Sequence, residues 1–305
     1  MSRSVAALAP LGAAVLWGVL YVVSTWGFAV VPPLTLAFFR MVVGAAVLLV
    51  VVRVSKPRRT FSRREWRSFA VLGGWVAVSI ATQYLGTALT SAGQGSLVTL
   101  LTPVFTLVLA VTVFDESLSR RGALGMTLAT VGTVALVVGR SGVDAGGNLL
   151  GSGLLVVAGG TFAVYTVYGK PLIRRYSALE AATYATLTSL PLFGAFALAE
   201  YLLRPAAFGF AVTGTLVAAV AYLGAFGTAA AWYLWYKGME YVGAATIAVF
   251  FFAQPVVGVA LGALVLGEPV GAPLFVGGTV MAVGIYLAST TDTTVERGET
   301  GADES

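Results

Sequence analysis

The chain has 305 residues, of which 58% are apolar and 10% are charged, with a formal net charge of +5. A soluble globular domain carries roughly 25% charged residues, so this composition excludes an ordinary soluble fold and indicates a polytopic membrane protein. The sequence contains no cysteine, no histidine and no Gly-Lys-Ser/Thr phosphate-binding loop. The absence of cysteine and histidine excludes disulfides and histidine-based metal sites, and the absence of the phosphate-binding loop argues against ATP hydrolysis by this chain. We predict no metal and no other cofactor.

Long apolar segments follow one another along the whole chain. A helix needs about 20 mainly apolar residues to cross a hydrocarbon core about 30 Å thick. Ten such segments are separated by proline, glycine or charge, at 6–27, 33–53, 68–89, 93–114, 120–139, 148–169, 178–200, 211–235, 242–266 and 272–289. The sequence therefore predicts an all-α integral membrane protein with ten transmembrane helices.

The second half of the chain repeats the first. Residues 92–137 share ten identities with residues 244–289 at an offset of 152. The matched pairs include Ala92 with Ala244, Pro103 with Pro255, Val104 with Val256, Glu116 with Glu268, Gly125 with Gly277 and Gly132 with Gly284. We predict a first five-helix repeat over 1–140 and a second over 141–290, followed by an acidic tail over 291–305 whose polar composition predicts disorder.

Each predicted repeat has an odd number of spans, so the second enters the membrane upside down relative to the first. Inverted repeats of this kind enclose a site near the midplane, and rocking of the halves exposes the site to alternate sides. The pattern indicates transport.

The basic residues predict the orientation, because Lys and Arg are retained in cytoplasmic loops. With both termini inside, the inner segments hold 15 of the 18 basic residues and the outer segments hold two, Arg140 and Arg204. Seven of the inner residues lie in the loop from Arg53 to Arg67. We interpret this loop as a topology determinant that attracts anionic lipid headgroups, and we predict no nucleic-acid partner.

Aromatic and neutral polar side chains recur at helical spacing and are candidates for a cavity lining. Trp17 and Tyr21 lie four residues apart, and so do Ser79 and Gln83, so each pair shares a helix face. The predicted lining consists of Trp17, Tyr21, Gln83, Tyr84, Tyr165, Trp232 and Gln254. Packing between helices is the alternative for each of them.

Arg40 is the one basic residue inside a predicted span. A charge in a span is costly and usually faces protein or a water-filled cavity. Two interpretations stay open: Arg40 contacts a substrate carboxylate near the outer mouth of the cavity, or it is a structural residue between helices.

Pro103 and Pro255 lie in the middle of the fourth and ninth predicted spans, where each removes a backbone hydrogen bond. We expect a kink at both, either purely structural or as a hinge beside the site. Glu116 and Glu268 follow 13 residues later, each just before a predicted helix start at Ser119 or Gly271. They are interpreted as caps of those helices, with a gating ion pair as the alternative.

Several motifs together resemble the EamA family of the drug/metabolite transporter superfamily. They are Ala14–Val22 (AVLWGVLYV), Leu36–Arg40 (LAFFR), Ser91–Gly95 (SAGQG), Leu101–Phe105 (LTPVF), Glu116–Ser119 (ESLS), Gly227–Trp235 (GTAAAWYLW), Ala253–Val256 (AQPV) and Gly267–Glu268. The resemblance covers roughly residues 6–289. It implies ten helices, an inward N-terminus and export or exchange of small metabolites through a central cavity.

Small multidrug pumps of the same superfamily bind cations with a glutamate in the first helix, and the first span here has no carboxylate. We therefore expect a neutral or zwitterionic substrate. The predicted function is a secondary transporter in a prokaryotic plasma membrane that exports or exchanges an amino acid or a similar net-neutral metabolite. The alternatives are a passive facilitator or a membrane-embedded enzyme, and an enzyme would need a cluster of acids or nucleophiles that is not seen.

Overall fold

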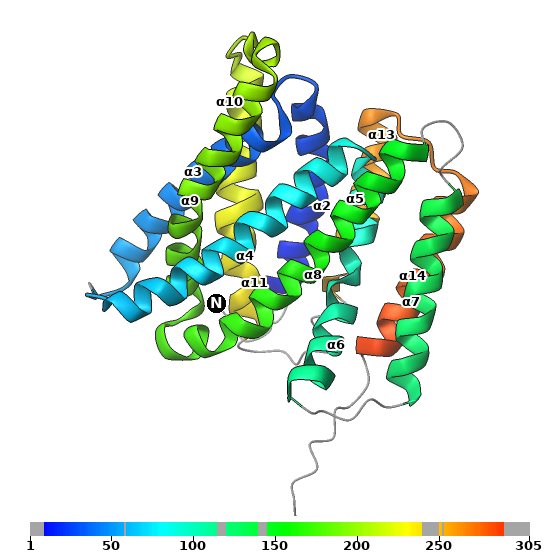
Figure 1. The fold of residues 1–305 in the computed structure, drawn as a ribbon, viewed down its shortest axis with the longest axis horizontal. Coiled ribbons are helices and arrows are strands. Elements are labelled where there is room, and N and C mark those ends of the chain that lie inside the picture. Colours follow the sequence, from blue (N-terminus) through cyan, green and yellow to red (C-terminus); the bar gives the residue numbers. More distant parts are fainter. Residues whose placement is uncertain are drawn as a thin grey trace, which may run out of the picture.

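The computed structural model describes residues 9–57, 59–114, 120–139, 145–239, 250–251 and 253–289. The regular elements in these ranges are all helices (Figure 1). They are α2 (Ala9–Phe28), α3 (Pro33–Ser55), α4 (Arg63–Ala88), α5 (Ala92–Val98), η1 (Thr99–Leu101), α6 (Thr102–Phe114), α7 (Arg120–Gly139), α8 (Ala145–Tyr176), α9 (Ala178–Leu203), η2 (Pro205–Phe208), α10 (Gly214–Ala221), η3 (Tyr222–Ala230), α11 (Ala231–Met239), α13 (Ala253–Leu266) and α14 (Ala272–Ser289).

Six helical segments in the described ranges are long and apolar enough to cross a membrane. They span Ala9–Phe28, Pro33–Ser55, Arg63–Ala88, Asn148–Gly169, Leu179–Leu203 and Gly214–Trp235, and two shorter apolar helices span Ala253–Leu266 and Ala272–Leu287. The expected all-α membrane class is therefore confirmed. Residues 242–249 and 252 of the ninth predicted span lie outside the described residues. Glu116 and the acidic tail lie outside them too.

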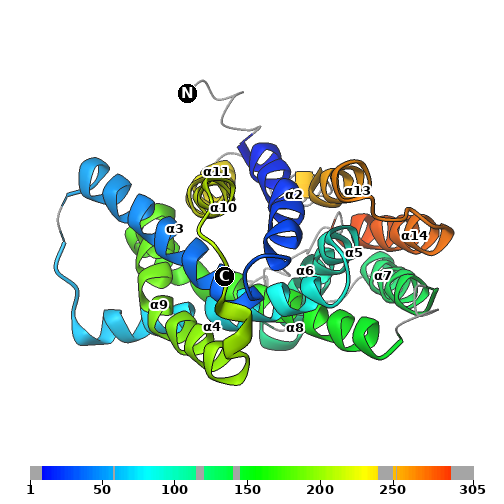
Figure 2. The same ribbon diagram turned by 90° about the horizontal axis from the view of Figure 1, so that it is seen from above.

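The helices pack in two opposed rows, seen from above in Figure 2. In one row α2 contacts α11 on one side and α13 on the other; in the second row α8 contacts α4 on one side and α6 on the other. At one end of the molecule α3 packs on α9, and at the other end α7 packs on α14. The helices that predicted repeats one and two contribute are thus interleaved across the whole molecule.

The α7–α14 pair approaches most closely, because glycines meet backbone there. A Cβ added to Gly132 would lie 2.3 Å from the backbone nitrogen of Met281 and 2.7 Å from the carbonyl oxygen of Gly277. A Cβ added to Gly284 would lie 2.6 Å from the carbonyl oxygen of Gly125. Small residues let helices in lipid come this close. The four glycines of the sequence repeat therefore face one another in two crossed pairs.

The helical run from Ala92 to Phe114 changes pitch at η1, immediately before Pro103. Proline has no N–H, so the carbonyl of Thr99, four residues earlier, loses its helical partner. The hydroxyl of Thr102 donates to that carbonyl at 2.8 Å. The backbone N–H of Thr102 also donates to that carbonyl, so the group freed by Pro103 is satisfied locally. Whether the chain kinks or hinges at Pro103 and Pro255 stays a prediction.

A second irregularity lies in the run from Gly214 to Met239, whose middle section η3 is a π-helix. The hydroxyl of Thr228 donates at 2.9 Å to the carbonyl of Leu223, five residues earlier. Single π segments within α-helices frequently mark functional sites. This one lies beside the cavity described next.

Candidate functional site

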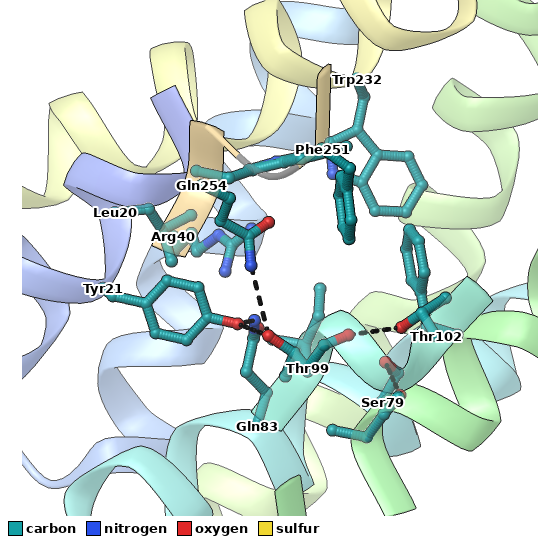
Figure 3. Close-up of a pocket in the computed structure, with 15 residues that line it drawn as sticks. Leu20, Tyr21, Arg40, Ser79, Gln83, Thr99, Thr102, Trp232, Phe251 and Gln254 are labelled. Atoms are coloured by element: carbon teal, nitrogen blue, oxygen red, sulfur yellow. Dashed lines mark hydrogen bonds between the residues drawn. The ribbon is translucent and has the colours of Figure 1, made fainter. Parts of the chain in front are cut away.

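A small cavity of about 60 Å³ lies between the two rows of helices (Figure 3). Its walls come from α2, α3, α4, η1, α6, α8, α11, α13 and residue Phe251. A water molecule needs roughly 10–15 Å³ of such space, so the cavity has room for a few waters, whereas pockets for drug-sized ligands measure about 300–1,000 Å³. In this conformation the cavity is therefore too narrow for a drug-sized ligand.

One hydroxyl, that of Thr99, organises the polar wall (Figure 3). It donates to the carbonyl of Gly95 at 2.9 Å and lies 2.7 Å from the hydroxyl of Tyr21. The side-chain amide of Gln254 donates to it at 3.2 Å, and the amide of Gln83 donates to the Tyr21 hydroxyl. Four separate helical segments thus meet through neutral hydrogen bonds.

Arg40 supplies the positive charge of the cavity and is only 3% exposed. Its Nε donates to Thr228 Oγ1 at 2.8 Å, and its two terminal nitrogens donate to the Tyr84 hydroxyl and the Gly227 carbonyl, each at 3.4 Å. All three acceptors are neutral. The described part of the chain contains two ion pairs, Arg59 with Glu180 and Arg175 with Glu65, and Arg40 takes part in neither.

The π-helical segment η3 presents two of these acceptors, Thr228 and Gly227. Its Gly227 carbonyl also accepts the indole N–H of Trp17 at 3.2 Å, so one backbone oxygen orients both the cationic and an aromatic side chain of the cavity. The Arg40 guanidinium further lies 5.5 Å from the centre of the Tyr84 ring, within range of a cation–π interaction. Tyr84 in turn accepts the hydroxyl of Ser24 at 3.1 Å.

Aromatic rings form the opposite wall. Phe251 lies 5.9 Å from Trp17, and Trp232 lies 6.1 Å from Phe162, both edge to face. All four rings line the cavity, and Figure 3 shows Phe251 and Trp232 along its upper side. Such walls combine an apolar surface with π faces that attract cationic groups.

Six of the eight residues proposed for substrate contact line this cavity: Trp17, Tyr21, Arg40, Gln83, Trp232 and Gln254. The other two stand behind the lining. Tyr84 holds Arg40, and Tyr165 packs 5.4 Å from Trp232. Arg40 lines the cavity. Whether it lies toward the outer mouth, and whether any of the eight residues binds substrate, stay predictions.

Sequence reasoning missed Thr99, Phe162, Thr228 and Phe251. The repeat offset of 152 offered a signal for two of them. It pairs Thr99 with Phe251, and each lies four residues before a matched proline, Pro103 or Pro255. Thr228 had none, since its orientation depends on the π-helical register of η3.

Glu268 caps a helix, but not the one expected. The prediction placed the cap at Gly271, at the start of α14. In the structure the carboxylate accepts the N–H groups of Ala92 at 2.6 Å and Gly93 at 2.9 Å, which are the first residues of α5. Carboxylates are favoured there by the unpaired N–H groups and the helix dipole. Glu268 therefore joins the α13–α14 connection to the other predicted repeat, and its partner by repeat, Glu116, lies outside the described residues.

Glu200, at the end of α9, plays the same part for α3. It accepts the N–H of Leu34 at 3.2 Å and both the N–H and hydroxyl of Thr35, at 2.8 and 2.9 Å. Glu268 and Glu200 thus each bind the start of a helix, and neither lines the cavity.

Comparison with known proteins places this architecture. The model of the EamA-like transporter family matches the chain twice, over residues 4–138 and 149–290. The chain belongs to the EamA-like transporter family. It is thus a multi-pass membrane transporter and not an enzyme.

Curated relatives of this EamA-like transporter span bacteria and archaea. An uncharacterized transporter of Archaeoglobus fulgidus is 25% identical over 276 residues, covering 89% of this chain and 94% of the relative. An uncharacterized transporter of Bacillus subtilis is 26% identical, covering 92% of each chain. A probable amino-acid metabolite efflux pump of Salmonella typhimurium is 25% identical, covering 94% of this chain and 95% of the pump.

One solved crystal structure resembles this EamA-like transporter in fold. It superposes with a TM-score of 0.64 at 23% sequence identity, covering 94% of this chain and 98% of the other. The likeness extends over nearly the whole length of both chains, so the two share one fold.

Proposed function

We propose that the chain is a secondary transporter that exports or exchanges a small net-neutral metabolite, of the amino-acid class, by alternating access. It would act in a prokaryotic plasma membrane with both termini in the cytoplasm, as ten transmembrane helices in two inverted repeats, 1–140 and 141–290. The observation that carries this proposal is Arg40, a buried cation that lines a cavity without any carboxylate in its described lining.

A zwitterion matches this cavity. Its carboxylate would receive the free N–H groups of the Arg40 guanidinium, which carries five donors and uses three of them here. Its ammonium group would lie against the rings of Trp17, Phe251 or Trp232 and the neutral oxygens of the Thr99 network. A buried charge whose partners are all neutral is costly in a low-dielectric interior. An anionic group bound to Arg40 would reduce that cost.

Crossed helix contacts support an inverted repeat. Gly18 on α2 packs against Val257 on α13, and Gly159 on α8 packs against Phe105 on α6; Phe105 and Val257 are separated by the repeat offset of 152. The first contact joins the first predicted span to the ninth, and the second joins the sixth to the fourth.

A second contact pair follows the same rule. Gly73 on α4 packs against Thr188 on α9, and Gly224 in η3 packs against Val43 on α3. These contacts join the third span to the seventh and the eighth to the second. Exchange of the two units thus turns each contact into the other, as a two-fold relation requires.

The narrowness of the cavity supports alternating access over a passive pore. A cavity that holds only a few waters must widen on one side to admit a metabolite. A facilitator with a continuously open path would not need that step.

Uptake into proteoliposomes tests the substrate class. Vesicles preloaded with unlabelled leucine, glutamate or arginine are diluted into buffer with traces of the same labelled amino acid, and exchange is measured against protein-free vesicles. We expect the neutral amino acid to exchange and the arginine, which carries net positive charge, to stay outside. Exchange of arginine alone would contradict a net-neutral substrate.

A further inference from the structure

A second cavity, of about 410 Å³, lies away from the central one, where α3 ends and α4 begins. The last turns of α3 line it with Val52 and Arg53, the connecting segment with Lys56 and Arg59, and α9 with Leu187. It combines an apolar floor with a cationic rim. None of its lining residues lines the central cavity.

The cavity lies at a membrane surface. Helix α3 has 23 residues, so it is about 35 Å long at 1.5 Å per residue and slightly exceeds a hydrocarbon core of about 30 Å. Its last turn and the segment that follows therefore reach the headgroup layer. Trp66, 40% exposed beside the cavity, is a residue type enriched at that depth.

One of the three cations at the rim is paired with a carboxylate, and the structure shows no ion pair for the other two among the described residues. Arg59 forms an ion pair at 3.5 Å with Glu180, whose side chain is 2% exposed, and this contact fixes the connecting segment on α9. Within the described residues, neither Arg53 nor Lys56 takes part in an ion pair. Three cations thus face one carboxylate around a single opening.

The floor below these cations includes packed aromatic rings. Phe61 packs 4.7 Å from Tyr184 and 5.8 Å from Trp66, and Trp66 packs 5.6 Å from Tyr184. Beside the rim, Val50 and Val54 on α3 are 62% and 84% exposed. This apolar strip of α3 continues from the cavity along the helix, where an acyl chain would lie.

We propose that this second cavity is a binding site for one anionic phospholipid. The phosphate of the headgroup binds between Arg53, Lys56 and Arg59, and an acyl chain follows Leu49, Val52 and the exposed valines of α3 into the bilayer. Anionic lipids attract basic residues next to membrane helices, and Arg matches phosphate oxygens with paired donors. The site does not depend on which solute the central cavity transports.

Native mass spectrometry of the purified chain tests the site with phosphatidylglycerol as the probe and phosphatidylcholine as the uncharged comparison. The test variant is Arg53→Gln with Lys56→Gln. The matched control is Arg63→Gln with Arg67→Gln, which removes the same charge from exposed positions outside the cavity. A second variant, Leu187→Trp, fills the cavity and leaves every charge in place.

We expect the unaltered chain and the control to retain one phosphatidylglycerol in preference to phosphatidylcholine. The test variant should bind it roughly 25-fold more weakly, about fivefold for each cation, and Leu187→Trp should also lose it. Thermal unfolding in lipid-free detergent shows that each variant is folded.

Three results would overturn the proposal. Equal losses in the test variant and the control would indicate a diffuse basic surface, and equal retention of phosphatidylcholine would remove the role of charge. Displacement of phosphatidylglycerol by inorganic phosphate at matched concentration would indicate a soluble-anion site in place of a lipid site.

Discussion

The α7–α14 pair packs through backbone contacts, whereas the helices around the central cavity contact one another through polar side chains. In the pair, Gly132 and Gly284 bring backbone against backbone with no room for a Cβ. Around the cavity, side chains such as Gln83, Gln254 and Arg40 leave space and connect through hydrogen bonds to neutral groups. One region is fixed by shape and the other is held by exchangeable polar contacts.

This difference indicates which helices can move relative to one another. Closely packed backbones have no alternative arrangement nearby, whereas a water-sized cavity bounded by hydrogen bonds can open by replacing those bonds with water or substrate. We therefore expect substitutions in the pair to change stability and substitutions at the cavity to change transport.

The largest effect is expected from Gly132→Leu. The new side chain would collide with the backbone of Met281 and force α7 away from α14, and we expect a loss of about 3 kcal/mol in the free energy of unfolding. Thermal unfolding in detergent, followed by tryptophan fluorescence, measures it. Gly74→Ala is the control, since nothing lies within 4 Å of an added Cβ there; a Gly132→Leu protein as stable as this control would disprove the close approach.

The next effect is on transport, from Arg40→Met. Hydrogen bonds to charged groups contribute roughly 1.5–3 kcal/mol, so loss of the guanidinium should weaken substrate binding about 10- to 100-fold while thermal stability changes little. Initial exchange rates at varied substrate concentration measure the loss. Arg40→Lys keeps the charge, so its substrate binding should lie between that of the unaltered protein and that of Arg40→Met. Unchanged exchange by Arg40→Met would assign Arg40 a structural role only.

Glu268→Gln tests the contact that joins the two regions. The amide keeps one acceptor but loses the charge that faces the start of α5, so we expect about 1 kcal/mol of destabilisation, as for loss of a helix cap. Hydrogen–deuterium exchange should rise at the amides of Ala92 and Gly93, which the carboxylate now accepts. Unchanged exchange at these two amides would show that the cap is not maintained in solution.

The smallest effect is expected from Gln254→Leu. Its amide makes neutral hydrogen bonds to Thr99 and Ser96, each worth about 1 kcal/mol, so transport should fall roughly fivefold with folding intact. Val256→Leu on the same helix is the control, because Val256 is 68% exposed. A Gln254→Leu protein that transports as the control does would remove Gln254 from the substrate lining.

Much of the fold was predictable because membrane helices follow from length and apolarity alone. Six of the eight proposed contacts also line the cavity. Polar side chains inside apolar spans are costly against lipid and therefore face other helices or a cavity. Spacing could not distinguish Tyr84 and Tyr165, one helical turn from lining positions, from the lining itself. Nor could it find Thr228, which depends on a π-helical register, or the partner of Glu268, which lies 175 residues or more away in sequence.

The central claim is that the cavity between the two rows is a substrate site open to each side in turn. Ser79→Cys tests it most directly, because Ser79 lines the cavity and the chain has no native cysteine. In inside-out and right-side-out vesicles, the account predicts that an impermeant thiol reagent labels this cysteine from either side and that the exchanged substrate protects it from both. Labelling from one side only, or labelling that substrate does not slow, would contradict it.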